Sequence, residues 1–193
     1  NYVLAADSGG QTLTLPSGAM SVRLNHSTAH AATFAAGSGA LANNQLDIAV
    51  TQAYGAGALN ASGYGSVKIT DASSNAQTLS NANFGAAALS LSGNQNYTFA
   101  GSLTAGDVDA SNLTGIAKLS ITDFSNSTAT RNTLTGTANN DTIVIANNPG
   151  ETITIDVKEG ANSVSVKNAS DTSNLSVTSG SGADTLTGGA GND

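Results

Sequence analysis

Large apolar residues recur in short, evenly spaced pairs along most of this chain. From about residue 65 onward, a single residue separates the two members of each pair, which is the period of a strand with one inward face. Eight such triplets are Val67-Lys-Ile69, Leu89-Ser-Leu91, Tyr97-Thr-Phe99, Leu119-Ser-Ile121, Ile143-Val-Ile145, Ile153-Thr-Ile155, Val164-Ser-Val166 and Leu175-Ser-Val177. The pattern predicts many short strands, separated by turns rich in Gly, Ser and Asn.

The spacing of the triplets predicts how the strands are arranged. Apolar residues recur at fixed intervals in two series: Ile153, Val164, Leu175 and Leu186 at 11 residues, and Ile69, Leu91, Leu113 and Leu134 at 22, 22 and 21. Two strands therefore make one coil of about 22 residues, the repeat of a parallel β-solenoid whose coils stack at about 4.8 Å. We expect an all-β, right-handed parallel β-solenoid or β-roll, in which Ile143, Val164 and Leu186 stack on one face.

The regularity changes along the chain. Residues 1–64 alternate less evenly, with candidate strands at residues 12–15, 21–24 and 46–50. We expect 1–64 to be an irregular β-rich N-terminal segment continuous with the solenoid of residues 65–178. Residues 179–193 begin a series of glycine-rich repeats, and because the last one stops at its sixth position, we expect the sequence to continue past Asp193.

Composition supports a thin, acidic solenoid. The chain of 193 residues has 22 Gly, one Met and only 4% aromatic residues, too few large side chains for a wide core. Its net charge is −7 and its six Lys and Arg are dispersed, so we expect cations as partners and no nucleic acid. It has no Cys and no apolar run near 18 residues, so we expect no disulfide and no transmembrane segment.

No catalytic motif is evident in the sequence. There is no H-E-x-x-H, no G-x-S-x-G and no phosphate-binding loop, and the basic residues do not cluster as a catalytic groove requires. We therefore expect that the chain is not an enzyme. His26 and His30 could form a transition-metal pair on a helical face, but without a third ligand a loop or cap is the simpler interpretation.

Two units of a nine-residue repeat close the chain, the second of them ending at its sixth position, and each has an Asp at that position, Asp184 and Asp193. Glycines in the turns allow positive φ and let carbonyls point at an ion, and the Asp supplies a hard anionic oxygen of the kind that calcium prefers. A looser copy begins at Gly136 and reaches Asp141. The units resemble the RTX nonapeptide, G-G-x-G-x-D-x-U-x with U a large apolar residue, which implies calcium turns at the C-terminal end of the solenoid.

The coil period also predicts which polar residues meet. Asp141, Asn162 and Asp184 each precede a stacked apolar residue by two positions, so they should form a polar column beside the core. Such a column can hold calcium between successive turns, or it can be an amide ladder without metal. The candidate calcium residues are Asp141, Asn162, Asp184 and Asp193, with the turn glycines Gly180, Gly182, Gly188, Gly189 and Gly191.

A wider resemblance covers residues 108–115, the Gly136 repeat and the closing nonapeptides. Together they are similar to the calcium-dependent S-layer proteins of Gram-negative bacteria that carry RTX repeats. That resemblance implies a secreted structural protein that assembles with copies of itself into a lattice on the bacterial cell surface when calcium binds. It also allows contact with cell-surface polysaccharide through regions outside this chain.

Two other classes stay open. One is a fragment of a secreted RTX adhesin, which shares the calcium-dependent folding but binds a receptor. The other is a calcium-binding accessory module of a secreted enzyme.

Overall fold

Short strands dominate the computed structural model, which describes residues 2–4, 10–25, 30–37, 43–126, 132–146 and 148–193. The strands are β1 (Tyr2–Leu4), β2 (Gln11–Leu15), β3 (Ala19–Leu24), β4 (Ala32–Ala36), β5 (Gln45–Val50), β6 (Gly55–Asn60), β7 (Ser66–Asp71), β8 (Gln77–Asn83), β9 (Ala88–Gly93), β10 (Tyr97–Ala105), β11 (Asp107–Leu113), β12 (Leu119–Asn126), β13 (Thr133–Thr135), β14 (Thr142–Ile145), β15 (Thr152–Asp156), β16 (Ser163–Val166), β17 (Asn174–Thr178) and β18 (Thr185–Thr187). None of the described residues belongs to a helix long and apolar enough to cross a membrane.

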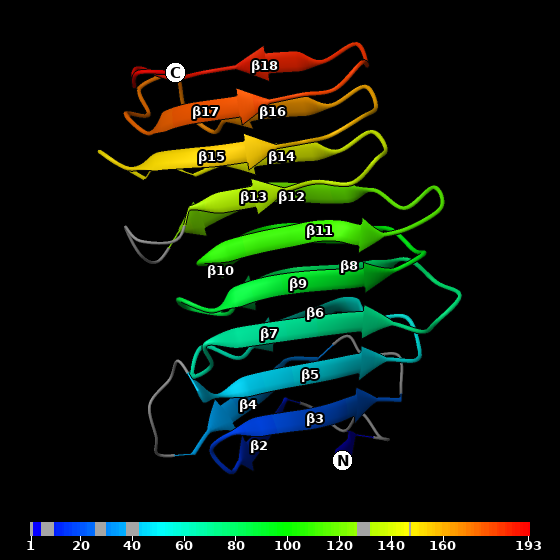
Figure 1. Cartoon of the computed structure of the whole chain (residues 1–193). Helices are drawn as coiled ribbons and strands as arrows, with labels where there is room; N and C mark the ends of the chain where they lie inside the picture. Colours follow the sequence, from blue (N-terminus) through cyan, green and yellow to red (C-terminus); the bar gives the residue numbers. More distant parts are fainter. Residues whose placement is uncertain (1, 5–9, 26–29, 38–42, 127–131, 147) are drawn as a thin grey trace.

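The strands form two parallel sheets of nine strands each. One sheet contains the odd-numbered strands in chain order and the other the even-numbered strands. In Figure 1 the odd-numbered strands run from left to right at the front, and the chain returns behind them as it rises toward the C-terminus, so the coil is right-handed. The expected all-β parallel solenoid is confirmed, with about eight turns of about 21 residues each.

Strand register agrees with most of the predicted stacking. Ile143 pairs with Val164 and Val164 with Leu186, as expected. The series through Leu113 gives the coil length but not a stack of neighbours, because Leu113 pairs with Gly93 and Leu134 pairs with Val108. The cause is a register shift between Asp109 and Asn112: one extra residue in β11 displaces the later pairings in that strand.

The core is one continuous cluster of side chains between the two sheets. Ile, Val and Leu fill it at the C-terminal end, whereas Phe34, Phe84, Phe99 and Phe124 widen it in the first two thirds of the chain. Three tyrosines are also buried there: Tyr54, Tyr64 and Tyr97. The strands before residue 64 belong to the same two sheets as the later ones. The division at residues 64 and 178 stays a prediction.

Candidate calcium site

The turns lie along two edges of the solenoid. We call the edge where each odd-numbered strand leads into the next even-numbered strand the first corner, and the opposite edge the second corner. At the first corner, the residues that open the even-numbered strands or directly precede them stack in register. This corner column contains Gln77, Tyr97, Leu119, Asp141, Asn162 and Asp184.

Polar members of the corner column bond to the backbone of the coil below. Asp141 Oδ1 accepts the Leu119 N–H at 2.8 Å, Asn162 Oδ1 accepts the Asp141 N–H at 2.9 Å, and Asp184 Oδ1 accepts the Asn162 N–H at 2.9 Å. The structure thus brings together Asp141, Asn162 and Asp184 as the coil period predicts. Each side chain satisfies a backbone donor that opens a strand, so the sixth position of the repeat has a structural role besides any metal binding.

Asp141 is closed by its own turn. Its Oδ2 accepts the Thr137 N–H at 2.6 Å, and its Oδ1 also accepts the Thr137 hydroxyl at 2.8 Å. Both residues are buried, and burial raises the pKa of the Asp141 carboxyl despite these donors. Because protein donors already surround both oxygens, an ion has little to add here, and the assignment of calcium to Asp141 stays a prediction.

Asp184 is more open. It is partly exposed, and its pKa is lowered mainly by the Asn162 N–H and also by the Ser179 hydroxyl. The exposed Glu159 of the coil below accepts the Ser181 N–H at 2.9 Å, and the Ser181 hydroxyl holds its pKa low. The charge of Asp184 acts in the opposite direction on Glu159. Two carboxylates that repel each other across adjacent coils form a site that favours a cation.

Asp193 occupies the matching position at the second corner. Its Oδ1 accepts the Leu175 N–H at 2.9 Å, and its Oδ2 accepts the Gly189 N–H at 3.0 Å. The bond from the residue four places earlier repeats the bond from Thr137 to Asp141. Asp193 is exposed, however, and glycine replaces the threonine that encloses Asp141.

The glycines of the closing repeats are required by crowding. A Cβ on Gly182 would lie 1.6 Å from the Gly160 carbonyl oxygen, and one on Gly191 would lie 2.0 Å from that of Ser173. The predicted positive φ is wrong for Gly180, Gly182, Gly188, Gly189 and Gly191, none of which adopts that conformation. At Gly180, Gly182, Gly189 and Gly191 consecutive coils approach so closely that no side chain fits between them, whereas a Cβ on Gly188 would meet Asp193 of its own turn. These close contacts account for the glycine pattern.

Three residues near these turns were not predicted from the sequence: Thr137, Glu159 and Asp171. Thr137 and Glu159 lie in turns that depart from the glycine consensus, so the pattern gave them no role. Asp171 begins an Asp-x-Ser turn, which is a weak signal in a chain rich in Ser and Thr. His26 of the predicted histidine pair lies outside the described residues.

Comparison with known protein families decides what these turns are. The model described as RTX calcium-binding nonapeptide repeat (4 copies) matches residues 126–144 and 176–193. This chain carries RTX calcium-binding repeats. RTX repeats bind calcium, and proteins with them are typically secreted. The looser copy at Gly136 falls within the first match, and both closing nonapeptides fall within the second.

No curated protein and no solved structure matches the chain significantly.

The donors at the RTX turns fit calcium. Asp184, Glu159 and Asp193 present hard carboxylate oxygens, and the glycine-rich backbone brings carbonyl oxygens of adjacent coils close together. Calcium takes six to eight such oxygens and tolerates irregular geometry. Bound there, the ion would neutralise carboxylates that otherwise repel each other across coils.

Proposed function

We propose that this protein is a secreted structural protein that calcium orders and that packs with copies of itself into a surface layer on a bacterial cell. The proposal gives the chain no catalytic role, because it assigns function to the outer faces of the sheets. The observation that carries it is an unequal distribution of charge between the two faces.

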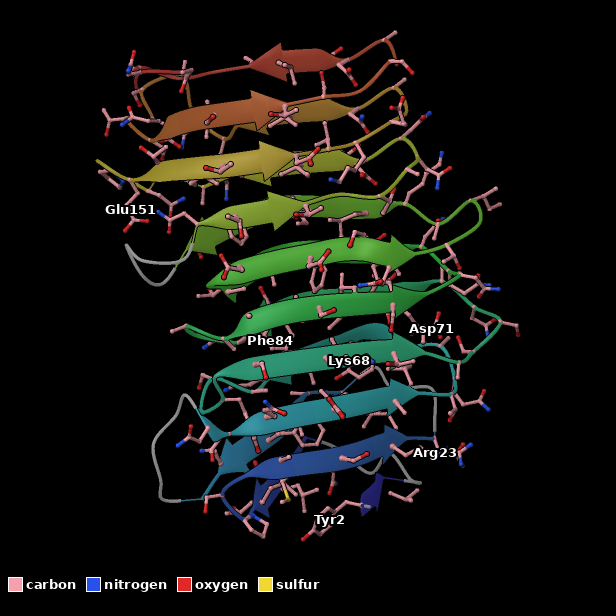
Figure 2. The ribbon with its side chains drawn as sticks, in the orientation of Figure 1. Tyr2, Arg23, Lys68, Asp71, Phe84 and Glu151 are labelled. Atoms are coloured by element: carbon pink, nitrogen blue, oxygen red, sulfur yellow. The ribbon has the colours of Figure 1, made fainter. Side chains whose placement is uncertain are left out.

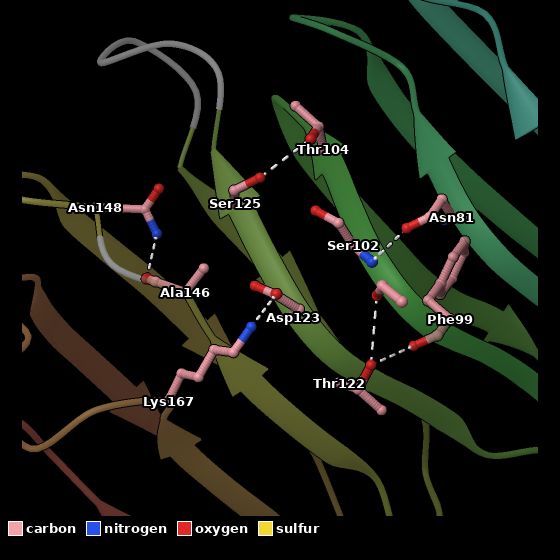
Figure 3. Close-up of polar contacts among 11 residues, drawn as sticks. Asn81, Phe99, Ser102, Thr104, Thr122, Asp123, Ser125, Ala146, Asn148 and Lys167 are labelled. Carbon is pink, nitrogen blue, oxygen red and sulfur yellow. Dashed lines mark hydrogen bonds and ion pairs between the residues drawn. The ribbon is translucent and has the colours of Figure 1, made fainter.

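The even-numbered sheet presents a neutral outer face. Asp123 in β12 is the one charged residue in its described strands, and it forms an ion pair with Lys167 (Figure 3). Hydroxyl residues stack in register across six of these strands: Thr78, Thr98, Ser120, Thr142, Ser163 and Thr185. Farther along the same face, the Thr104 and Ser125 hydroxyls bond to each other at 3.0 Å. We call this surface the hydroxyl face.

The odd-numbered sheet carries the charges. Six charged residues that are exposed or partly exposed lie on its strands: Arg23, Asp47, Lys68, Asp107, Asp109 and Asp156. Figure 2 shows Arg23 and Lys68 on the front of the odd-numbered sheet. Four of the six are acidic, so this face contributes to the repulsion between two copies of a chain with net charge −7.

Two copies therefore approach most easily through their hydroxyl faces. Packed sheets lie about 10 Å apart, a distance at which charges are only partly screened at physiological ionic strength. Small hydroxyl side chains leave a flat surface that can pack closely and exchange hydrogen bonds. Calcium would act on the same assembly by ordering the closing coils, whose strands extend this face.

The test compares two matched variants by electron microscopy and light scattering. Thr98→Asp adds a charge to the hydroxyl face, and Ser90→Asp adds the same charge to the odd-numbered face, at a similarly exposed site in a neighbouring strand. We expect the wild-type protein and Ser90→Asp to form ordered sheets at millimolar calcium, and Thr98→Asp to stay monomeric. A wild-type protein that stays monomeric, or two variants that assemble equally, would contradict the proposal.

A further inference from the structure

At the second corner, a buried carboxylate lies beneath the last RTX repeat. Asp171 is 1% exposed, and its Oδ1 accepts the Ser173 N–H at 2.8 Å and the Ser173 hydroxyl at 2.6 Å. Its Oδ2 is also buried and has no hydrogen-bond partner among the described residues. A buried anionic oxygen without a donor is costly, because it has lost its hydration and gained nothing in return.

The closing repeat passes directly over this carboxylate. The Ala190 N–H donates to the Asp171 carbonyl at 2.6 Å, which fixes the turn of residues 188–193 above the turn that contains Asp171. A Cβ on Gly189 would lie 2.4 Å from the Asp171 carbonyl oxygen and 3.3 Å from Asp171 Cβ. Only glycine lets the upper coil approach this closely, so the repeat and Asp171 form one corner.

We propose that Asp171 Oδ2 is a calcium ligand that the coil below contributes to the last RTX repeat. The inference rests on calcium binding by the repeat and on the proposed role of calcium in ordering the closing coils. Asp171 lies outside the matched residues 176–193, so it extends the site to a turn without the repeat pattern.

Charge favours a divalent cation at this oxygen. Asp171 and Asp193 reach the same corner from adjacent coils, and their two charges balance one calcium ion. Both oxygens of Asp193 keep acceptor capacity after each takes one N–H, since a carboxylate has about four acceptor positions.

The chain contains a matched control. Asp71 begins an Asp-x-Ser turn with the same backbone hydrogen bond: the Ser73 N–H donates to its Oδ1 at 2.7 Å, and its Oδ2 is likewise without a partner in the described parts of the chain. The Ser73 hydroxyl donates to the Asn75 carbonyl instead. No glycine-rich repeat lies above it. The Gln77 amide donates to its Oδ1 instead, and its charge helps to raise the pKa of the buried Tyr97 hydroxyl, so Asp71 has protein groups beside it.

The experiment measures calcium binding by titration calorimetry for the whole chain and for Asp171→Asn and Asp71→Asn. Asn keeps the Oδ1 acceptor for Ser173 and removes the charged Oδ2. We expect Asp171→Asn to lose one calcium ion or to bind it about 10-fold to 100-fold more weakly. Asp71→Asn should bind calcium as the wild-type protein does. Unchanged stoichiometry and affinity in Asp171→Asn would overturn the inference.

Melting curves separate a ligand from a merely structural residue. A ligand role predicts that Asp171→Asn is at least as stable as the wild-type protein in excess chelator, since a buried unpaired charge is gone, and less stable in calcium. An equal loss in both conditions, including failure to fold in both, would overturn the inference. Calcium binding at Asp171 requires no contact between copies of the chain, and the comparison of variants does not depend on sheet formation, so failure of this inference is distinguishable from failure of the proposed function.

Discussion

The turns at Asp141 and Asp184 lie at the same corner and place an Asp at the same repeat position in the same column, yet different groups surround the two carboxylates. At Asp141, the Thr137 N–H and hydroxyl occupy the carboxylate, and both residues are buried. At Asp184, the residue four places earlier is Gly180, whose N–H bonds to the Lys158 carbonyl instead. The carboxylate of Asp184 stays partly exposed next to a second acidic residue, Glu159.

This difference shows that one repeat can serve two purposes. In both turns the Asp accepts a backbone N–H from the coil below, which aligns the coils. A threonine in the turn then supplies from within the protein the donors that neutralise the carboxylate. Glycine leaves that place open and brings the next coil closer, so we expect a cation to complete the turn at Asp184. We therefore expect a few residues in each turn to decide whether a coil depends on calcium.

The largest effect should follow the loss of Asp141. Asp141→Ala leaves the buried N–H groups of Leu119 and Thr137 without their acceptor, and we expect the free energy of unfolding to fall by about 3 kcal/mol. The loss should be the same in calcium and in excess chelator, because protein donors already bond to both oxygens of Asp141. Denaturant titration in both conditions measures it, and a loss confined to calcium would reverse our interpretation of the comparison.

Removing calcium should act on the turn at Asp184 and the rest of the closing repeats. Binding to a site that exists only in the folded state adds about 2.7 kcal/mol at a hundredfold excess over Kd, so chelation should lower the melting temperature and loosen residues from about 179 onward. Hydrogen exchange locates the loosened segment. Asp184→Ala should remove most of the calcium response, whereas Asp71→Ala should retain it. Identical melting and exchange with calcium and with chelator would mean that the closing repeats act only as turns.

Replacing Thr137 should make the turn at Asp141 more like the turn at Asp184. Thr137→Gly removes the hydroxyl that donates to Asp141, and we expect a loss of about 1 kcal/mol in chelator and a larger gain in melting temperature on adding calcium than in the wild-type protein. Thr137→Val is the control, since it removes the same hydroxyl but keeps the bulk of the side chain. Equal calcium responses in the two variants would show that the open space is irrelevant.

The smallest effect is a difference in titration. Burial raises the pKa of Asp141 above the ordinary value of 3.8, and the Asn162 N–H lowers that of Asp184 below it. The pH-dependent part of the contribution of Asp141 to stability is therefore present below its unfolded pKa and is lost as pH rises through its folded pKa. That of Asp184 is present above its unfolded pKa and is lost as pH falls through its folded pKa. Side-chain carboxyl NMR of the calcium-free protein should place the two on opposite sides of 3.8, and both on one side would contradict this prediction.

The sequence predicted the coil and the stacking because both depend on a period. Ile143, Val164 and Leu186 recur at the coil length, and parallel pairing must then bring them into register. The pairing of Leu113 could not be predicted in the same way. Leu113 is an inward residue 22 residues after Leu91. The register shift between Asp109 and Asn112, however, depends on how two neighbouring strands accommodate one extra residue, which the spacing does not reveal.

The site was predictable only as far as it repeats. Asp184 and Asp193 stand at fixed positions in glycine-rich units, so their type and spacing indicated calcium. Asp171 stands in a turn without that pattern, and its position under Gly189 follows from an 18-residue coil that differs from the length found elsewhere. The reason for the glycines was also missed, because close contact between coils belongs to the stack and is absent from the local sequence.

The buried tyrosines have a consequence for the spectroscopy of this protein. The chain has no Trp, and Tyr54, Tyr64 and Tyr97 are all buried in coils that precede the RTX turns. The fourth tyrosine, Tyr2, lies in β1. Ultraviolet emission therefore comes only from coils that precede the RTX turns, and it should stay constant while the closing coils order around calcium. Leu186→Trp, at a half-exposed position on β18, would place a fluorophore on those coils. In the unmodified protein, tyrosine emission that does not change on adding calcium is the behaviour expected of a correctly folded chain.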